Sequence, residues 1–247
     1  GIGPLLIVVS GVVLTIMVGA LLARMLGLGR EMGLLTGGAV AICGASAALA
    51  LSAVMPRNVH QERNTIMTVV GVTALSTLAM IVYPLLVSVL GWTDSEAGIF
   101  LGGTIHDVAQ VVGAGYMISD DAGDVATFVK LLRVAMLVPA VMVFIFIFRG
   151  SNQQSSKTRV PVLPGFLVAF VIIVLINSLG WIPTRVTGAF TELSRWCMVA
   201  AIAALGIKTS FKELAVVGWR PVLLMLAETL FLLVFVMTCI HFGLGGL

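Results

Sequence analysis

Long apolar runs follow one another along almost the whole chain, with short polar connectors between them. A helix needs about 20 mostly apolar residues to cross the hydrocarbon core of a bilayer. The segments that meet this length lie at residues 4–26, 33–55, 65–90, 95–117, 124–149, 162–179, 188–208 and 219–243. Only 10% of the residues are charged, whereas soluble domains carry roughly 25%. The sequence therefore predicts an all-α, polytopic transmembrane helix bundle.

The connectors indicate how the bundle is oriented. Lysine and arginine are more frequent in the connectors after the first, third, fifth and seventh segments, and the positive-inside rule places those connectors in the cytoplasm. The basic residues thus indicate membrane topology, and no nucleic-acid partner is expected. Thr93 and Glu96 fit a capping box that opens the fourth segment, since they are spaced to satisfy each other's backbone amides.

Small residues cluster in the middle of segment 33–55. Glycine weakens a helix and lets backbones approach closely. A break at this point would direct free amides and helix ends toward a substrate cavity. A continuous helix whose small residues permit tight packing would give the same pattern, so both interpretations stay open. The small residues are Gly37, Gly38, Cys43, Gly44, Ala45 and Ser46.

Segment 188–208 has a similar composition, with Ala204 and Gly206 near its end. It follows segment 33–55 by five segments, the spacing expected of two five-helix repeats. Because the repeat length is odd, the second copy would be inverted in the membrane, as in secondary transporters. The chain would then be one transmembrane domain, with residues 1–90 as the remainder of the first repeat and 91–247 as the second. Two N-terminal spans would be missing.

Segment 95–117 holds several polar residues near its centre. They are Thr104, His106, Asp107 and Gln110. Ionisable groups inside a membrane are costly, and by default they line a cavity or pair with one another. A continuous helix would place Thr104, Asp107 and Gln110 on one face. This cluster predicts a surface that binds a substrate or an ion, with a structural hydrogen-bond cluster as the alternative.

Two later spans also carry charged residues. Lys130 and Arg133 share a helix face by their spacing, from which they could attract an anion or neutralise Asp107. Lys130 alone could instead extend to the membrane interface. Glu228 lies inside the last span and needs a partner, for which Arg220 or an arginine of another helix would serve.

Four motifs resemble the YeiH-like family, which is described as a family of sulfate exporters. They are ICGASA at 42–47, GGTIHDVAQVVGAG at 102–115, KLLRV at 130–134 and AALG at 203–206. The resemblance extends over essentially the whole chain. It implies a multi-pass protein of the bacterial inner membrane, distantly similar to the bile acid/sodium symporter fold. That fold has two inverted five-helix repeats and a pair of discontinuous crossing helices, which here would be segments 33–55 and 188–208. Family members have additional N-terminal spans.

These features together favour a secondary transporter of a small anion, either sulfate or a related sulfonate or organic anion, working by alternating access. A coupling proton or sodium ion would bind Asp107 and Glu228. The expected partners are the anion, the coupling ion, the bilayer and further copies of the chain, with no cofactor and no metal. The residues expected to bind the anion are Cys43, Gly44, Ala45, Ser46, Thr104, His106, Gln110, Arg133, Ala204 and Gly206.

Two other functions are the alternatives. An intramembrane enzyme would use His106, Asp107 and Cys43 as its chemical groups. The sequence lacks the zinc-binding HExxH motif and the GxSxG nucleophile motif, so we expect no enzyme. A passive channel subunit is less favoured, because charges of both signs within the spans suit a gated binding site better than a pore.

Overall fold

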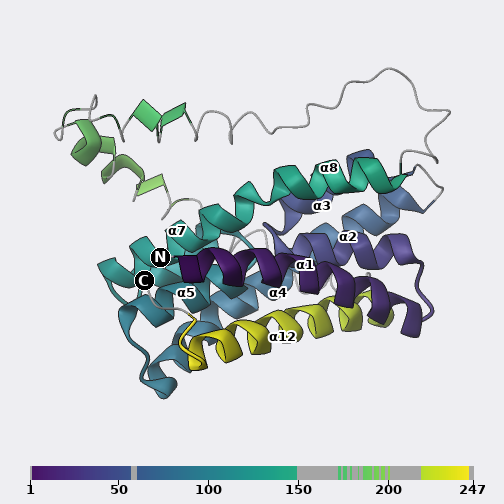
Figure 1. The fold of residues 1–247 in the computed structure, drawn as a ribbon, viewed down its shortest axis with the longest axis horizontal. Helices are drawn as coiled ribbons and strands as arrows, with labels where there is room; N and C mark the ends of the chain where they lie inside the picture. Colours follow the sequence, from purple (N-terminus) through teal and green to yellow (C-terminus); the bar gives the residue numbers. More distant parts are fainter. Residues whose placement is uncertain are drawn as a thin grey trace.

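A computed structural model describes residues 2–56, 60–148 and 218–244, together with scattered residues between 172 and 200. In this described part the regular elements are helices, with no strand among them (Figure 1). The prediction of an all-α bundle is therefore confirmed. The helices are α1 (Ile2–Met25), α2 (Arg30–Ala41), α3 (Ala45–Val54), α4 (Gln61–Leu90), α5 (Asp94–Thr104), α6 (Val108–Tyr116), α7 (Asp120–Ala135), α8 (Leu137–Phe148) and α12 (Trp219–His241).

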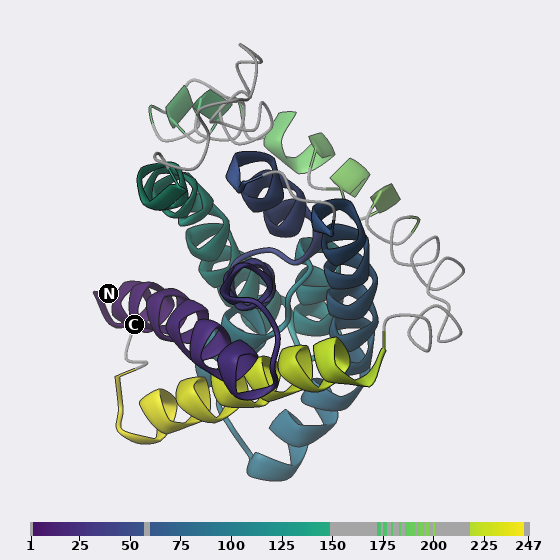
Figure 2. The same ribbon diagram turned by 90° about the vertical axis from the view of Figure 1, so that its right-hand side faces the viewer.

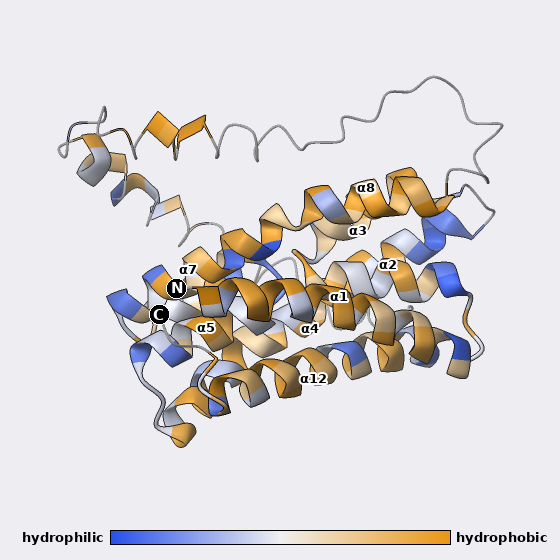
Figure 3. Cartoon of the chain, in the orientation of Figure 1, coloured by the Kyte–Doolittle hydropathy of each residue, from blue (hydrophilic) through white to orange (hydrophobic). Residues whose placement is uncertain are grey.

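Four stretches of helix are long and apolar enough to cross a membrane. They are Ile2–Met25, Gln61–Leu90, Asp120–Phe148 and Trp219–His241. Large apolar side chains such as those of Val89 and Phe146 are exposed on their outer faces. Figure 3 shows hydrophobic residues along most of the long helices, with hydrophilic residues at many helix ends and also at points within α7 and α12. This surface suits the hydrocarbon of a bilayer, where exposed apolar groups cost nothing.

Helix α2 lies in the middle of the bundle. Each of its residues 32–41 is buried, and Figure 2 shows the helix nearly end-on with the other helices around it. Glycines allow this close packing. A Cβ on Gly33 would lie 2.3 Å from the carbonyl oxygen of Gly19 in α1, and a Cβ on Gly37 would lie 3.0 Å from the Cα of Ile16. The small residues of α2 therefore permit tight packing against α1.

The helix nevertheless breaks, so the interpretation of segment 33–55 as a continuous helix is wrong and the predicted break is confirmed. A substrate cavity at this break stays a prediction. Helix α2 ends at Ala41 and α3 begins at Ala45. The small residues thus serve two purposes, because those before the break allow α1 to approach and those within it allow the chain to turn. The predicted crossing partner, segment 188–208, includes Ala204 and Gly206 and lies outside the described residues, as does segment 162–179. The division into inverted repeats stays a prediction.

Segment 95–117 differs from the prediction of a continuous helix. The capping box at its start is confirmed, with the Thr93 amide 2.9 Å from Glu96 Oε2. The helix stops at Thr104, however, and resumes at Val108. The backbone between them is extended at Ile105 and at Asp107. The common helical face expected for Thr104, Asp107 and Gln110 is therefore wrong, because these residues belong to two separate helices.

Candidate functional site

The first break, between α2 and α3, depends on a glycine. Gly44 has φ +66° and ψ −125°, a conformation that is essentially restricted to glycine. The Gly44 amide donates to the Ala39 carbonyl at 2.8 Å, and the Ile42 amide donates to the Gly38 carbonyl at 3.1 Å. These bonds close the last turn of α2. The carbonyls of residues 40–42 are left pointing beyond the helix end, where they need other donors.

The second break, between α5 and α6, is set by an aspartate. Asp107 is the N-cap of α6, and its Oδ1 accepts a hydrogen bond from the Gln110 amide at 3.3 Å. The Asp107 amide in turn donates to the Ser76 hydroxyl of α4 at 3.0 Å. A side chain that caps a new helix competes with continuation of the old one. The break therefore follows from the side chain of Asp107 itself.

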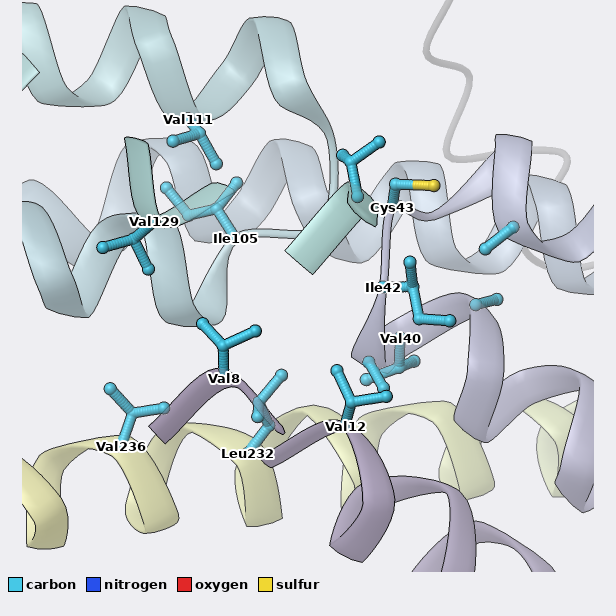
Figure 4. Close-up of a cluster of buried hydrophobic side chains, with 14 of the residues drawn as sticks. Val8, Val12, Val40, Ile42, Cys43, Ile105, Val111, Val129, Leu232 and Val236 are labelled. Atoms are coloured by element: carbon cyan, nitrogen blue, oxygen red, sulfur yellow. The ribbon is translucent and has the colours of Figure 1, made fainter. Parts of the chain in front are cut away.

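The two breaks lie against each other. A Cβ on Gly44 would lie 3.7 Å from the Cβ of His106, and His106 Nδ1 is 3.0 Å from the carbonyl oxygen of Val40. Figure 4 shows apolar side chains around this point that come from both breaks and from α1, α7 and α12, with Ile42 and Ile105 among them. Broken backbone is tolerated at membrane depth where protein groups satisfy it.

Lys130 of α7 satisfies part of this broken backbone. Its ammonium group donates to the carbonyl oxygen of Ile42 at 2.9 Å, to that of Ile105 at 3.0 Å, and to that of His106. A protonated lysine has three hydrogens to donate, so three acceptors match the charged form. The residue is fully buried, and it does not extend to the interface as one interpretation of the sequence had it.

Arg133, one turn further along α7, donates hydrogen bonds to further backbone carbonyls at the two breaks. Its Nε donates to the Ala41 carbonyl at 2.8 Å and its Nη2 to the Val40 carbonyl at 2.8 Å. Its Nη1 donates to the carbonyls of Gly102 and Ile105, at 3.2 and 3.1 Å. The rigid fork of the guanidinium thus joins the C-terminal end of α2 to that of α5. These ends carry the negative poles of the helix dipoles, which the two buried cations offset.

Neither cation forms an ion pair with a carboxylate in the described part of the chain. The expected neutralisation of Asp107 is thus not a direct ion pair in this conformation, although the charges of Asp107 and Lys130 act on each other at longer range. The prediction that the two cations share a face is correct, and their common target is the backbone.

His106 connects the crossing point to α12. The side chain is fully buried, and because a carbonyl can only accept, Nδ1 donates its hydrogen to Val40. Its Nε2 lies 3.1 Å from Thr229 Oγ1. The hydroxyl of Thr229 also lies 2.8 Å from the Met225 carbonyl, within its own helix. The imidazole therefore contacts the end of α2 through Nδ1 and contacts α12 through Nε2.

Polar groups on α4 and α6 form a second cluster next to the break. The Gln110 side-chain amide donates to Thr77 Oγ1 at 3.0 Å, while Gln110 Oε1 is buried without a partner in the described residues. Asp107 is half-buried beside Ser76. Sequence reasoning missed Ser76 and Thr77, although two adjacent hydroxyls in the middle of a span were a usable signal.

Glu228 has a different partner from the one expected. Its Oε1 lies 2.8 Å from the Thr36 hydroxyl of α2, and its Oε2 has no partner in the described part. The expectation that Glu228 pairs with an arginine, such as Arg220, is therefore wrong within the described residues. Thr36 and Thr229 were not identified from the sequence.

An intramembrane enzyme would use His106, Asp107 and Cys43. These residues are close together, but no hydrogen bond joins the Cys43 thiol to the His106 imidazole in the described part of the chain. Cys43 is buried in the α2–α3 break, and both imidazole nitrogens of His106 are engaged by Val40 and Thr229. No group of side chains suited to hold a metal ion is present among the described residues. Of the other predicted residues in this break, Gly44 is buried, Ala45 is half-buried and Ser46 is exposed.

An apolar groove of about 690 Å³ lies apart from the crossing point, between α1, α2 and α8. Its polar lining is restricted to Arg24 and Arg30, and its other walls are hydrocarbon. An anion needs donors or positive charge along its surface. In the lining of the groove Arg24 and Arg30 meet this requirement, whereas the crossing combines two buried cations with the ends of two broken helices.

Comparison with known proteins gives relatives that share most of the chain. UPF0324 membrane protein CT0845 of Chlorobaculum tepidum is 55% identical over 238 residues, covering 96% of this chain and 66% of the relative. UPF0324 membrane protein TauZ of Paracoccus denitrificans is 49% identical over 243 residues, covering 98% and 72%. UPF0324 membrane protein RB0971 of Rhizobium meliloti is 49% identical over 242 residues, covering 97% and 70%. The chain thus spans 66 to 72% of the length of these relatives. No solved structure gives a significant match.

Long apolar helices packed around two broken ones define a multi-pass α-helical membrane protein. The chain belongs to the family described as Conserved hypothetical protein 698, whose profile matches residues 1–225. This result agrees with the resemblance to the YeiH-like family that the motifs indicate.

Proposed function

We propose that this chain forms the carrier part of a secondary transporter for a small anion, in a bacterial inner membrane. The observation that carries the proposal is the meeting of two broken helices beneath two buried cations, Lys130 and Arg133. Secondary transporters bind substrate near the bilayer midplane, between discontinuous helices whose ends face the ligand. Sulfate, or a related sulfonate or organic anion, suits such a site by its charge.

The electrostatics of the crossing support an anionic substrate. Helices α3 and α6 begin at the two breaks, and helix N-termini carry the positive poles of their dipoles. The hydrogens of Lys130 and of Arg133 are directed at backbone carbonyls, so these side chains act on an anion through their charge. In a medium of low dielectric constant that influence extends beyond direct contact.

The direct contacts of the anion would come from the breaks. Backbone amides around Cys43, Gly44, Ala45 and Ser46 would bind it together with Thr104, His106 and Gln110, with Ala204 and Gly206 of segment 188–208 completing the site. In the present conformation the Thr104 hydroxyl donates to the Phe100 carbonyl at 2.6 Å. Alternating access requires that such bonds exchange as the half-helices tilt.

Enzymatic and passive-channel functions have less support. Catalysis by Cys43 needs a base in contact with its thiol, and the His106 nitrogens bond elsewhere. A passive channel needs charges that face a continuous aqueous path, whereas Lys130 and Arg133 are buried against carbonyls.

The test is labelled-sulfate counterflow into proteoliposomes that contain the full-length protein, with methanesulfonate and small organic anions as competitors. We expect labelled sulfate to accumulate against unlabelled sulfate inside, and competitors to reduce it. The control is the exposed-carboxylate variant Glu62→Gln, which should behave as wild type. Folded protein that accumulates none of these anions would overturn the proposal, and large single-channel currents would favour the channel.

A further inference from the structure

Glu228 is the one carboxyl group on the described helices that lies wholly inside the bundle, with an exposed fraction of 0%. It is near the middle of α12, an apolar helix long enough to span a bilayer. A buried carboxylate without a compensating charge is very unfavourable, and such a group takes up a proton instead. Whether Glu228 carries a proton therefore depends on which of its neighbours donate and which accept hydrogen bonds.

The hydrogen bonds of Thr36 indicate where that proton lies. The Thr36 hydroxyl is 2.8 Å from Glu228 Oε1 and 3.0 Å from the carbonyl oxygen of Met32. A hydroxyl has one hydrogen to donate, and a carbonyl can only accept. The hydroxyl can donate that hydrogen to Glu228 Oε1, or it can donate to Met32 while a protonated Glu228 donates to the hydroxyl. Only the second arrangement makes both contacts hydrogen bonds at the same time, and it requires the protonated acid.

Helices α1 and α2 form a slot around the carboxyl group. A Cβ on Gly19 would lie 2.4 Å from Glu228 Oε1 and 2.7 Å from the Gly33 carbonyl oxygen, so the missing side chain of Gly19 makes the room. Glu228 Oε2 and the hydroxyl oxygen of Thr15 are both buried without a partner in the described residues. Thr15 precedes Gly19 by one helical turn, on the face of α1 that meets α2.

Other ionisable groups on the helices packed against α12 lie away from Glu228. His106 is the nearest in the bonding network, because it contacts Thr229, the next residue of α12. Lys130 and Arg133 lie beyond His106, at the helix breaks. The remaining groups on α1, α2, α4, α5 and α12 lie toward helix ends or in other contacts: Arg24, Arg30, Glu31, Glu62, Arg63, Tyr83, Asp94, Glu96, Arg220, Cys239 and His241.

We propose that Glu228 is a proton-binding site that couples the anion carrier to a proton gradient, an inference that rests on the proposed function. In the present packing the group is the neutral acid, held by Thr36 in the slot beside Gly19. When α12 separates from α1 and α2 and water enters, the acid gives one proton to water and becomes a carboxylate. The charged form cannot return to the dry slot, so each return takes up one proton.

The position of Glu228 links this proton to the site of the anion. Its neighbour Thr229 holds His106, and His106 holds the Val40 carbonyl at the end of α2. Movement of α12 that exposes Glu228 therefore also changes the contacts at the crossing of the broken helices. The same element, α12, responds to both ligands, as coupling between two sites requires.

Infrared difference spectroscopy of the full-length protein in lipid vesicles tests the protonation directly. At neutral pH we expect a carboxylic-acid C=O band that Glu228→Gln removes and the control Glu62→Gln keeps. Thr36→Val should shift this band, because it removes the hydrogen-bond partner. Glutamine has the shape of the neutral acid, so Glu228→Gln should keep the wild-type melting temperature. Absence of the band, or a band that persists in Glu228→Gln, would overturn the proposal.

Flux measurements then test the coupling. With an inward proton gradient and labelled sulfate or methanesulfonate as the probe, Glu228→Gln should lose gradient-driven accumulation and keep counterflow exchange. Equal gradient-driven accumulation by wild type and variant would overturn the coupling role. If wild-type protein moves neither probe, the proposed function fails for these anions, while the infrared band still decides whether Glu228 binds a proton.

Discussion

Arg133 Nη2 lies 2.8 Å from the carbonyl oxygen of Val40, the second-last residue of α2. The same guanidinium reaches the carbonyls at the end of α5, so one side chain fixes two interrupted helices relative to each other. Buried backbone carbonyls need donors, and the hydrocarbon of a bilayer offers none. The cation is therefore a structural part of the crossing before any ligand binds.

Replacing Arg133 by methionine should destabilise the protein strongly. Four hydrogen bonds to backbone carbonyls are lost, and each buried group left without a partner costs about 1–3 kcal/mol. Arg133→Lys should recover part of the loss, because lysine keeps the charge and lacks the planar fork. Thermal unfolding in detergent or lipid measures the melting temperatures, which should decrease from wild type to Arg133→Lys to Arg133→Met. Arg63→Gln, at an exposed site on α4, is the matched control, and equal melting temperatures for Arg133→Met and this control would contradict the structural role.

Gly44→Ala should weaken the α2–α3 break. The backbone at Gly44, with φ +66° and ψ −125°, would cost another residue on the order of 1–3 kcal/mol. Gly91→Ala is the matched control, because Gly91 has φ +65° and ψ 31°, a left-handed conformation that costs other residues about 1–2 kcal/mol. The free energy of unfolding should therefore fall more for Gly44→Ala. The opposite order would mean that the break relaxes without strain.

Gly33→Ala should separate α1 from α2, whereas Gly29→Ala should not. A Cβ on Gly33 would lie 2.3 Å from the backbone oxygen of Gly19, and a Cβ on Gly29 would meet nothing within 4 Å. Overpacking against a backbone that cannot move away costs about 1–3 kcal/mol or more, and surface changes usually stay within about 0.5 kcal/mol. Melting temperatures of the two variants provide the comparison. A tolerated Gly33→Ala would indicate that α1 can shift freely.

The sequence predicted the parts of this structure that depend on local patterns. Long apolar runs identified the helices, and the spacing of Thr93 and Glu96 identified a helix start that the structure confirms. The break at 105–107 was missed, because the i, i+3 spacing of its polar residues also suits a continuous helix. A local signal was present nonetheless. Asp107 followed by Gln110 and an apolar pair is a helix-start pattern, inside a run assumed to be one span.

Other features of the site had no local signal. The acceptors of Lys130 and Arg133 are backbone carbonyls, which every residue carries, so nothing in the sequence marks residues 40–42 as their partners. Glu228 and Thr36 are 192 positions apart, and their contact depends on the glycines that bring α1 and α2 together. Charged residues inside a span predict that partners exist, and the packing of helices decides which ones.

Asp107→Asn and Asp107→Ala should separate two roles of Asp107. The carboxylate caps α6 through the Gln110 amide, and asparagine caps about as well as aspartate, whereas alanine costs about 0.5–2 kcal/mol. We therefore expect Asp107→Asn to keep the wild-type melting temperature and Asp107→Ala to lower it. On the proposed function, both variants should lose sulfate counterflow, because both remove the charge half-buried beside the crossing. Wild-type counterflow in folded Asp107→Asn would restrict Asp107 to capping, and the coupling role would then rest on Glu228, the buried carboxyl of the described helices.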